Sequence, residues 1–309
     1  MTIQRRQFLR NSGLAVSGLL FTGLACRQGE TKQTPSPEAD KDSLAAAAAT
    51  ATTAALAAYG IQLYTLRDDL PKDPKAILKQ VAGFGYTQVE GYEGDKGMFW
   101  GMGHKGFKSY LDELGLKMVS SHCDMNKDFE KKAAEAAEIG MKYLICPYIG
   151  PQKTLDEYKK FADTFNQKGE VCRKNGIRFA YHNHAYTFQP LAKEMPQDIL
   201  MQSSDPALVD FEMDIYWVAT AGSDPEAWLK KYPKRFTLCH VKDRLKTAKP
   251  EEQEASCDLG TGAIDFAAVL KTAKEQGMQY YLLEQERYDN STPLKSAEAG
   301  AAYLKNIRI

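Results

Sequence analysis

From Tyr59 onward, short apolar runs alternate with longer stretches in which apolar residues recur at helical spacing. The short runs are rich in β-branched and aromatic residues, a composition typical of strands. We expect eight strands, at residues 60–66, 87–92, 117–124, 142–149, 177–184, 207–217, 235–243 and 278–286. We expect helices between them, at residues 73–85, 104–115, 128–140, 154–176, 224–234 and 263–277. The pattern therefore predicts regular alternation of strand and helix.

Alternation of eight strands with helices over about 250 residues predicts an α/β fold, the (β/α)8 TIM barrel. A doubly wound sheet is the alternative, but no GxGxxG motif follows the first expected strand. Asp73-Pro74 and Asp224-Pro225 fit helix starts, with the aspartate as N-cap and the proline as the first helical residue. We therefore expect residues 58–309 to form one barrel domain.

Each of the last four expected strands has, near its carboxyl end, two polar side chains that are two positions apart. Residues i and i+2 of a strand point to the same face, so the two members of a pair share a face. All of them lie at the carboxyl ends of strands, where TIM-barrel active sites are built. The pairs are His182 and His184, Glu212 and Asp214, His240 and Lys242, and Glu284 and Glu286. One metal site at the mouth of the barrel accounts for all four pairs.

We expect one metal ligand from each of these strands, namely His182, Asp214, His240 and Glu284. Two imidazoles and two carboxylates form a mixed nitrogen and oxygen set, which suits one divalent transition metal (Mn, Co, Fe, Ni or Zn) better than Ca or Mg. A single strand histidine is more often structural, but four such side chains at equivalent depths are far more specific. A ligating histidine also needs a hydrogen-bond acceptor, for which Glu212 and Asp243 are candidates.

The first 57 residues differ in composition from the rest of the chain. Residues 1–26 combine Arg5-Arg6 with a short apolar stretch, the arrangement of an export signal. The RRQFL segment resembles the twin-arginine export motif, and the four residues that end at Cys26 resemble a bacterial lipobox. Residues 27–57 are rich in Ala, Thr and Pro and predict a low-complexity tether. We expect an exported protein, periplasmic or held on the periplasmic side of a membrane only by a lipid at Cys26.

Charge and cysteine content argue against two further classes of protein. The chain has 40 basic and 40 acidic residues and a formal net charge of 0. A nucleic-acid-binding protein usually has a basic surface, so we expect no nucleic-acid partner. The cysteines that follow Cys26 are odd in number and show no CxxC spacing, so we expect no disulfide framework.

The chain from about residue 58 to 309 resembles the xylose isomerase-like TIM-barrel superfamily, the sugar isomerase and epimerase group that also includes inosose dehydratase and endonuclease IV. The resemblance is carried by the motifs VEGYEG (89–94), YHNHAYTF (181–188), DFEMDIYWVATAGSDP (210–225), LCHVKD (238–243), LGTGAIDF (259–266) and LLEQE (282–286). It implies a ligand set of Glu, Asp, His and Glu, at the positions of His182, Asp214, His240 and Glu284. His182 departs from this set, because the sugar epimerases have a Glu at this position. That Glu also acts as a base in those enzymes.

A metal-bound imidazole has no free lone pair for a carbon-bound proton, so another base must serve. The candidates at strand ends that face the expected mouth are Glu90, His122, His184, Lys242 and Glu286. Candidates for substrate binding are Asn183 and the aromatic residues that could stack on a sugar ring, Tyr64, Trp100, Tyr148, Tyr186 and Trp217. The glycine-rich loop around Phe99-Trp100 is a candidate lid.

We expect metal-assisted proton abstraction next to the carbonyl of a non-phosphorylated carbohydrate, through an enediolate. We expect a sugar isomerase or epimerase, in which the proton returns to the substrate. The alternative is a lyase or dehydratase of a keto-sugar, keto-inositol or 3-keto-glycoside, in which a β-substituent is lost. A non-catalytic sugar-binding barrel is a third hypothesis. Five histidines and zero net charge disfavour an endonuclease-like phosphodiesterase. A sugar oxidoreductase is an expected partner, and related barrels often form homodimers.

Overall fold

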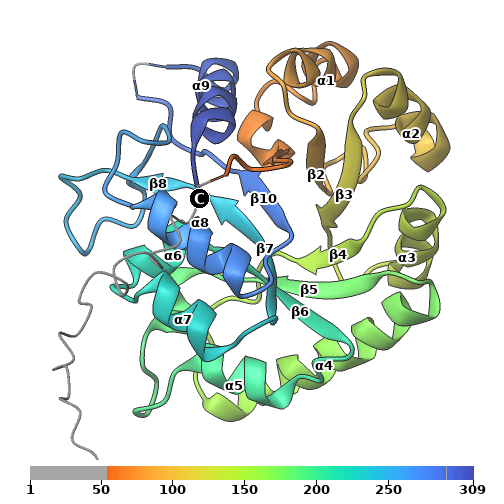
Figure 1. The fold of residues 1–309 in the computed structure, drawn as a ribbon. Helices are drawn as coiled ribbons and strands as arrows, with labels where there is room; N and C mark the ends of the chain where they lie inside the picture. Colours follow the sequence, from red (N-terminus) through yellow and green to blue (C-terminus); the bar gives the residue numbers. More distant parts are fainter. Residues whose placement is uncertain (1–53, 290) are drawn as a thin grey trace, which may run out of the picture. The chain divides into compact units, whose positions relative to one another are not determined.

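Eight parallel strands close into a barrel, which confirms the predicted (β/α)8 fold (Figure 1). The computed structural model describes residues 54–289 and 291–309. The strands follow the order β1-β2-β3-β4-β5-β6-β7-β10, and β10 pairs with β1. Their bounds are β1 Gly60–Gln62, β2 Gln88–Tyr92, β3 Lys117–His122, β4 Tyr143–Cys146, β5 Arg178–His182, β6 Val209–Asp214, β7 Phe236–Val241 and β10 Tyr280–Leu283.

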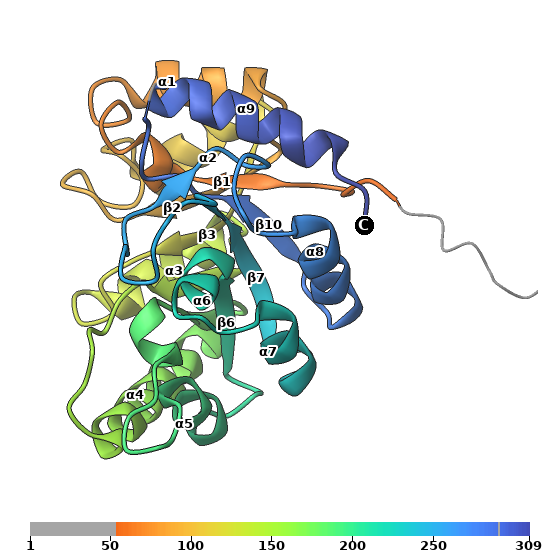
Figure 2. The same ribbon diagram turned by 90° about the vertical axis from the view of Figure 1, so that its left-hand side faces the viewer.

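Helices surround the strands on the outside of the barrel (Figures 1 and 2). They are η1 Leu63–Leu66, α1 Pro74–Gly83, α2 Gly103–Glu113, α3 Phe129–Glu138, α4 Leu155–Lys174, η2 Ala185–Phe188, α5 Pro196–Ser203, α6 Ile215–Thr220, α7 Pro225–Lys231, α8 Phe266–Glu275 and α9 Pro293–Asn306. A separate antiparallel ribbon pairs β8 Asp243–Arg244 with β9 Ser256–Cys257. Across residues 54–289 and 291–309, no helix is both long and apolar enough to cross a membrane.

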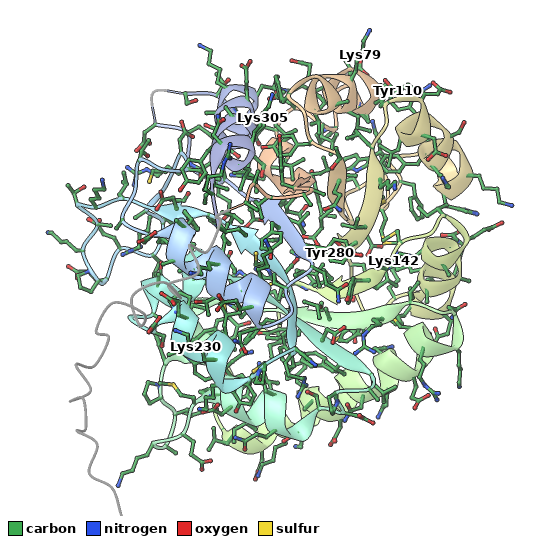
Figure 3. The ribbon with its side chains drawn as sticks, viewed as in Figure 1. Lys79, Tyr110, Lys142, Lys230, Tyr280 and Lys305 are labelled. Carbon is green, nitrogen blue, oxygen red and sulfur yellow. The ribbon has the colours of Figure 1, made fainter. Side chains whose placement is uncertain are left out.

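An apolar layer fills the barrel below the mouth. It is a cluster of buried side chains from the strands, Val119, Tyr143, Ile145, Ala180, Leu238 and Leu282. His182, His240 and Glu284 each follow a member of this layer by two residues, so they face the same interior one step nearer the mouth. Figure 3 shows the side chains that fill the molecule, with Tyr280 near the middle of the view and Lys79 pointing outward. The polar side chains at the mouth thus rest on a packed apolar floor.

The two predicted helix starts are confirmed by their hydrogen bonds. The Asp73 side chain accepts a hydrogen bond from the backbone N–H of Ala76 at 3.0 Å, and that of Asp224 accepts one from Glu226 at 2.9 Å. In both helices the next residue is a proline, which has no N–H to leave unpaired. These caps explain why α1 and α7 begin where they do.

The expected strand at residues 207–217 is shorter in the structure. β6 ends at Asp214, and α6 begins directly after it. The Asp214 side chain accepts a hydrogen bond from the backbone N–H of Trp217 at 3.0 Å, which satisfies one of the free donors at the start of α6. Trp217 therefore stands on a helix at the mouth of the barrel.

The described barrel domain includes residues before 58. Ala54 and Ile309 exchange two backbone hydrogen bonds of 2.9 Å each, and Leu56 packs against the hydrophobic core. Residues 54–57 of the expected tether thus make contacts with the barrel domain. The predicted export signal, Cys26 and residues 27–53 lie outside the described residues.

We expect a protein that lacks residues 1–57 to be less stable than one that lacks residues 1–53, by about 1–3 kcal/mol of unfolding free energy. The longer deletion removes both hydrogen bonds between Ala54 and Ile309 and the packing of Leu56. Urea unfolding of the two proteins measures the difference, and both should unfold cooperatively. Equal stability of the two proteins would show that residues 54–57 contribute nothing to the fold.

Asp243 anchors the loop that contains the LGTGAID segment. Its buried carboxylate accepts hydrogen bonds from the backbone N–H groups of Arg244 (2.8 Å), Gly260 (3.0 Å), Gly262 (2.9 Å) and Ile264 (3.2 Å). A side chain at Gly262 would collide with this carboxylate. The role of Asp243 is therefore to hold a loop, and its carboxylate has no capacity left for a ligating histidine.

We expect Asp243→Ala to lower the unfolding free energy by about 3–5 kcal/mol, because four backbone donors lose a buried charged acceptor. Asp163→Ala, at an exposed position of α4, is the matched control and should change stability by no more than about 0.5 kcal/mol. Urea unfolding checks both variants. A loss below about 1 kcal/mol for Asp243→Ala would mean that water replaces the carboxylate at little cost.

Candidate metal centre and active site

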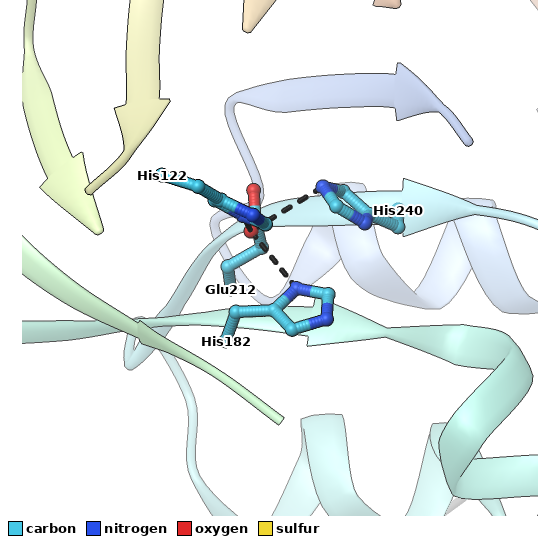
Figure 4. Close-up of side chains that lie close together, drawn as sticks. All are labelled: His122, His182, Glu212 and His240. Carbon is cyan, nitrogen blue, oxygen red and sulfur yellow. Dashed lines mark hydrogen bonds and ion pairs between the residues drawn. The ribbon is translucent and has the colours of Figure 1, made fainter. Parts of the chain in front are cut away.

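Three imidazoles converge on the Glu212 carboxylate inside the barrel (Figure 4). Glu212 Oε2 lies 2.8 Å from His122 Nε2, 3.0 Å from His182 Nδ1 and 3.3 Å from His240 Nε2. All four residues are buried. They come from β3, β5, β6 and β7, whose carboxyl ends meet at this point.

A second cluster lies next to the first and shares His240 with it. His240 Nδ1 lies 3.2 Å from Glu284 Oε2 and 3.9 Å from Asp214 Oδ2. His182 Nε2 also lies 3.9 Å from Asp214 Oδ2. The four ligands predicted from the sequence therefore come together in the structure, one each from β5, β6 and β7 and one directly after β10.

His182 and His240, the two predicted histidine ligands, each point one ring nitrogen at a carboxylate of the predicted metal site and the other at a neighbouring glutamate. His182 turns Nδ1 to Glu212 and Nε2 to Asp214, whereas His240 turns Nε2 to Glu90 at 2.7 Å and Nδ1 to Glu284. Metal-bound histidines typically donate their second ring N–H to a carboxylate, which fixes the tautomer and the ring direction. Glu212 and Glu90 are placed to do this, so each imidazole has its other nitrogen available for a metal.

The donor set fits a divalent cation. Asp214 Oδ2 is buried and has no hydrogen-bond partner among the described residues. The same is true of Glu212 Oε1. A buried carboxylate oxygen without a donor is costly, and a cation would satisfy it. His182, Asp214, His240 and Glu284 supply nitrogen and oxygen donors, the combination that first-row transition metals and zinc favour. These four residues could hold one such ion.

Burial and neighbouring charges shift the pKa values of these residues. Burial lowers the pKa of His182 to about 4, so its imidazole is neutral and can bind a metal at pH 7. Burial raises the pKa of Asp214 to about 6, in spite of the nearby Lys242. Burial alone would lower the pKa of His240, but Glu212 and Glu284 raise it well above its usual value. Without a metal, His240 therefore holds a proton that a metal ion would displace.

A cavity of about 530 Å³ opens above the metal ligands, within the range of small-molecule sites. Its lining includes two of the ligands, His182 and Glu284. The remaining lining residues are Tyr64, Tyr92, Glu93, His122, Cys123, Asp124, Lys127, Pro147, Tyr148, His184, Trp217 and Glu286. A small molecule in this cavity would have direct access to the metal site.

Three of the five predicted base candidates line the cavity, and two lie behind it. His122, His184 and Glu286 are in the lining. Glu90 is fully buried and bonds with His240, so it orients a ligand. Lys242 is 1% exposed and pairs with Glu286 and, at 3.4 Å, with Glu284. Glu90 and Lys242, two of the predicted base candidates, are therefore buried and paired, and neither is among the residues that line the cavity.

Glu286 is the best placed base among the three that line the cavity. Burial, together with His182, lowers the pKa of His184 to about 2, which makes it a weak base. Burial would also lower the pKa of His122, but Glu90 and Glu212 raise it, so this imidazole tends to carry a proton. Glu286 keeps a carboxylate at the cavity surface beside the Lys242 ammonium.

Some of the predicted substrate-binding residues line the cavity, and others lie behind it. Tyr64 and Trp217 line the cavity. Trp100 is 4% exposed, packs against Tyr92 with ring centroids 5.0 Å apart, and is absent from the lining. Asn183 is buried, and its side chain bonds with both the backbone N–H and the backbone carbonyl of Asp214 at 3.2 Å. Trp100 and Asn183 therefore support the site without reaching the cavity.

Sequence reasoning did not assign Glu93, Asp124 or Lys127 to the site. All three lie on the loops after β2 and β3 and line the cavity. Glu93 belongs to the VEGYEG motif, which gave a signal, whereas Asp124 and Lys127 stand in an ordinary polar loop. That Asp124 and Lys127 line the cavity is visible only in the folded structure, where these loops lie at the barrel mouth.

A barrel with a histidine and carboxylate centre at the carboxyl ends of its strands defines the class of metal-dependent TIM-barrel enzymes. Residues 78–307 match the family described as Xylose isomerase-like TIM barrel, and the chain belongs to this family.

Curated relatives of the chain are inosose dehydratases. That of Clostridium tetani is 28% identical over 169 residues, which span 50% of this chain and 56% of that protein. That of Geobacillus kaustophilus is 22% identical over 272 residues, which span 75% of this chain and 86% of that protein. The first alignment thus covers little more than half of its relative.

Solved structures with the same fold include sugar-modifying enzymes. A sugar phosphate isomerase/epimerase from Parabacteroides distasonis has a TM-score of 0.69 and 29% identity, covering 79% of this chain and 96% of that one. The IOLI protein with a bound zinc atom has a TM-score of 0.65 at 16% identity, covering 79% of this chain and 95% of that one, a likeness of fold alone. The chain therefore belongs with sugar-modifying enzymes, both isomerases and dehydratases.

Proposed function

We propose that this protein is a metal-dependent enzyme that removes a proton next to the carbonyl of a non-phosphorylated sugar. The observation that carries the proposal is the convergence of His182, Asp214, His240 and Glu284 beneath a cavity that also contains Glu286. When bound there, a divalent cation would supply Lewis-acid stabilisation of negative charge on substrate oxygens.

The charge of the cavity supports an uncharged substrate. Its lining contains four carboxylates, Glu93, Asp124, Glu284 and Glu286, and one lysine, Lys127. A phosphate group that does not contact the bound cation would carry further negative charge toward these carboxylates, which costs Coulomb energy. A neutral sugar has hydroxyl groups that can donate hydrogen bonds to carboxylates.

Within this chemistry, we favour a lyase, because the curated relatives are dehydratases. Glu286 accepts the proton next to the carbonyl, and the Lys242 ammonium holds this carboxylate in place. The carbon–oxygen bond at the neighbouring carbon then breaks, the leaving hydroxyl takes this proton back from Glu286, and water departs as a carbon–carbon double bond forms. Epimerisation at one carbon also needs a group that returns a proton on the opposite face of the substrate, for which His122 in the cavity lining is the candidate. The inosose dehydratase relatives support this order of preference.

An isomerase is the second candidate, because one base can move a proton between neighbouring carbons on a single face. It is supported by the likeness to the Parabacteroides distasonis sugar phosphate isomerase/epimerase. We further propose that the protein acts after export, on a substrate whose carbonyl a sugar oxidoreductase has introduced.

Elemental analysis of the purified protein followed by solvent-deuterium exchange tests the proposal. We expect about one transition metal per chain and entry of deuterium next to the carbonyl of a keto-sugar or keto-inositol, followed by NMR. A product that has lost water identifies a lyase, and a product that differs from the substrate only in arrangement and deuterium content identifies an isomerase or epimerase. Absence of both metal and exchange would favour a sugar-binding barrel without catalysis.

A further inference from the structure

We propose that the cavity contains a second binding subsite and that the substrate is a glycoside, with a sugar ring at the metal centre and a second group in this subsite. The inference rests on the proposed function, which places the reacting ring beside the metal ligands. The subsite is formed by lining residues at or after the carboxyl ends of β1, β2, β3 and β4, namely Tyr64, Tyr92, Glu93, Asp124, Lys127 and Tyr148. We call it the distal subsite.

The cavity is larger than one sugar ring requires. At the roughly 30 Å³ that a water molecule occupies in the liquid, 530 Å³ corresponds to about 18 water-sized groups. This number exceeds the non-hydrogen atoms of a single hexose. A hexose bound at His182 and Glu284 would therefore leave the part of the cavity around the distal subsite unfilled.

Two exposed tyrosines mark the distal subsite. Among the described residues, Tyr64 and Tyr148 are the large hydrophobic side chains that remain exposed, at 38% and 57%. Each is held by a ring behind it, Tyr64 by Tyr92 at 5.2 Å between ring centroids and Tyr148 by Tyr186 at 5.6 Å. Aromatic rings that are exposed, braced and on the wall of one cavity are suited to stack on a ligand ring.

The polar residues between the tyrosines suit a neutral, hydroxyl-rich group. Glu93 is fixed by hydrogen bonds from Lys132 Nζ at 2.6 Å and from the Asp124 backbone N–H at 2.9 Å. Lys127 has no ion-pair partner among the residues that the structure describes, so its ammonium is available to a ligand. Fixed acceptors and a free donor next to aromatic rings are a combination that binds sugar hydroxyls and C–H faces together.

The distal subsite has no part in the proposed proton abstraction, since its residues lie at or after the ends of β1 to β4, whereas Glu286 and the metal ligands lie near or after the ends of β5, β6, β7 and β10. Its residues can contribute only binding energy. Binding energy from a non-reacting part of the substrate orients the reacting ring and raises the rate. The distal subsite therefore sets substrate size, and a glycoside should be preferred over a monosaccharide.

Calorimetric binding of unoxidised sugars to the full chain tests the inference, because these sugars need not react to bind. The probes are methyl β-glucoside as the one-ring reference and cellobiose, trehalose and phenyl β-glucoside as two-ring ligands. We expect at least one two-ring ligand to bind about tenfold more tightly than the reference. Tyr64→Ala or Tyr148→Ala should reduce this preference below threefold, whereas Tyr148→Phe, which keeps the ring, should retain it.

A preference below threefold in the wild-type protein overturns the inference, and so does a preference that survives in both alanine variants. Thermal unfolding of the variants confirms that the fold is retained, as expected for exposed side chains. Failure of the proposed function appears separately. A two-ring preference without deuterium exchange would support the distal subsite and contradict the proposed enzymatic function. Deuterium exchange without the preference would support the function and contradict the distal subsite.

Discussion

His240→Ala should lose bound metal and lower the rate of the proposed reaction by about 10³-fold or more. His240 is fully buried and is the residue shared by both clusters, with Nδ1 toward Asp214 and Glu284 and Nε2 toward Glu90. Its removal takes away one of two nitrogen ligands and leaves carboxylates close together without a partner. Elemental analysis and the deuterium-exchange assay measure the two effects independently.

His104→Ala is the matched control for this variant. His104 lies on α2, pairs with Glu138 at 2.7 Å between Nε2 and Oε2, and does not contact the metal ligands. The control should retain both metal and activity. Circular dichroism and urea unfolding show whether His240→Ala remains folded. A folded His240→Ala protein that is free of metal and turns over at the wild-type rate would overturn the metal-site assignment.

Glu286→Gln should lower the rate of deuterium exchange by about 10²- to 10⁴-fold while metal content stays unchanged. Glutamine has the shape of glutamate and can still accept a hydrogen bond from Lys242, but it cannot take the proton from carbon. Glu286 is not one of the four ligands, so the metal should remain. The difference between exchange and metal content separates the base from the ligands.

Asp124→Asn is the control for Glu286→Gln, because Asp124 is a carboxylate in the same cavity but on the opposite loops. It should alter KM and leave kcat within about threefold of wild type. If Glu286→Gln exchanges deuterium within tenfold of the wild-type rate, the base is another group that lines the cavity. His122 would then be the next residue to substitute.

Strand positions and helix caps were accessible from the sequence for local reasons. Period-two alternation places Ala180 and His182, or Leu238 and His240, on one face of a strand wherever that strand sits. The aspartate–proline pairs mark helix starts through contacts within four residues. The end of β6 was misplaced because the apolar residues after Asp214 continue the strand-like pattern. The Asp214 side chain, which accepts a hydrogen bond from the Trp217 backbone N–H, caps a helix at this point.

The proximity of the four predicted ligands was also predictable, since each is a polar residue near the end of a strand that the barrel closes into a ring. The roles of their neighbours were not. Glu90 and Glu286 were both expected at strand ends, yet Glu90 lies inside β2, buried against His240, and Glu286 lies after β10 and lines the cavity. Lys242 was assigned to the cavity but is buried and ion-paired. Burial and partners depend on residues far away in the chain.

By itself, the sequence determined the barrel, the ends of the strands where chemistry-bearing residues collect, and the types of atom they offer to a metal. These follow from periodicity and residue chemistry, which are local properties. Only the tertiary structure decided which nitrogen of His182 and His240 faces a carboxylate, which carboxylate faces the cavity, and which loops cover the mouth. The physical reason is that the protonation and exposure of a buried group are set by the side chains that other strands bring beside it.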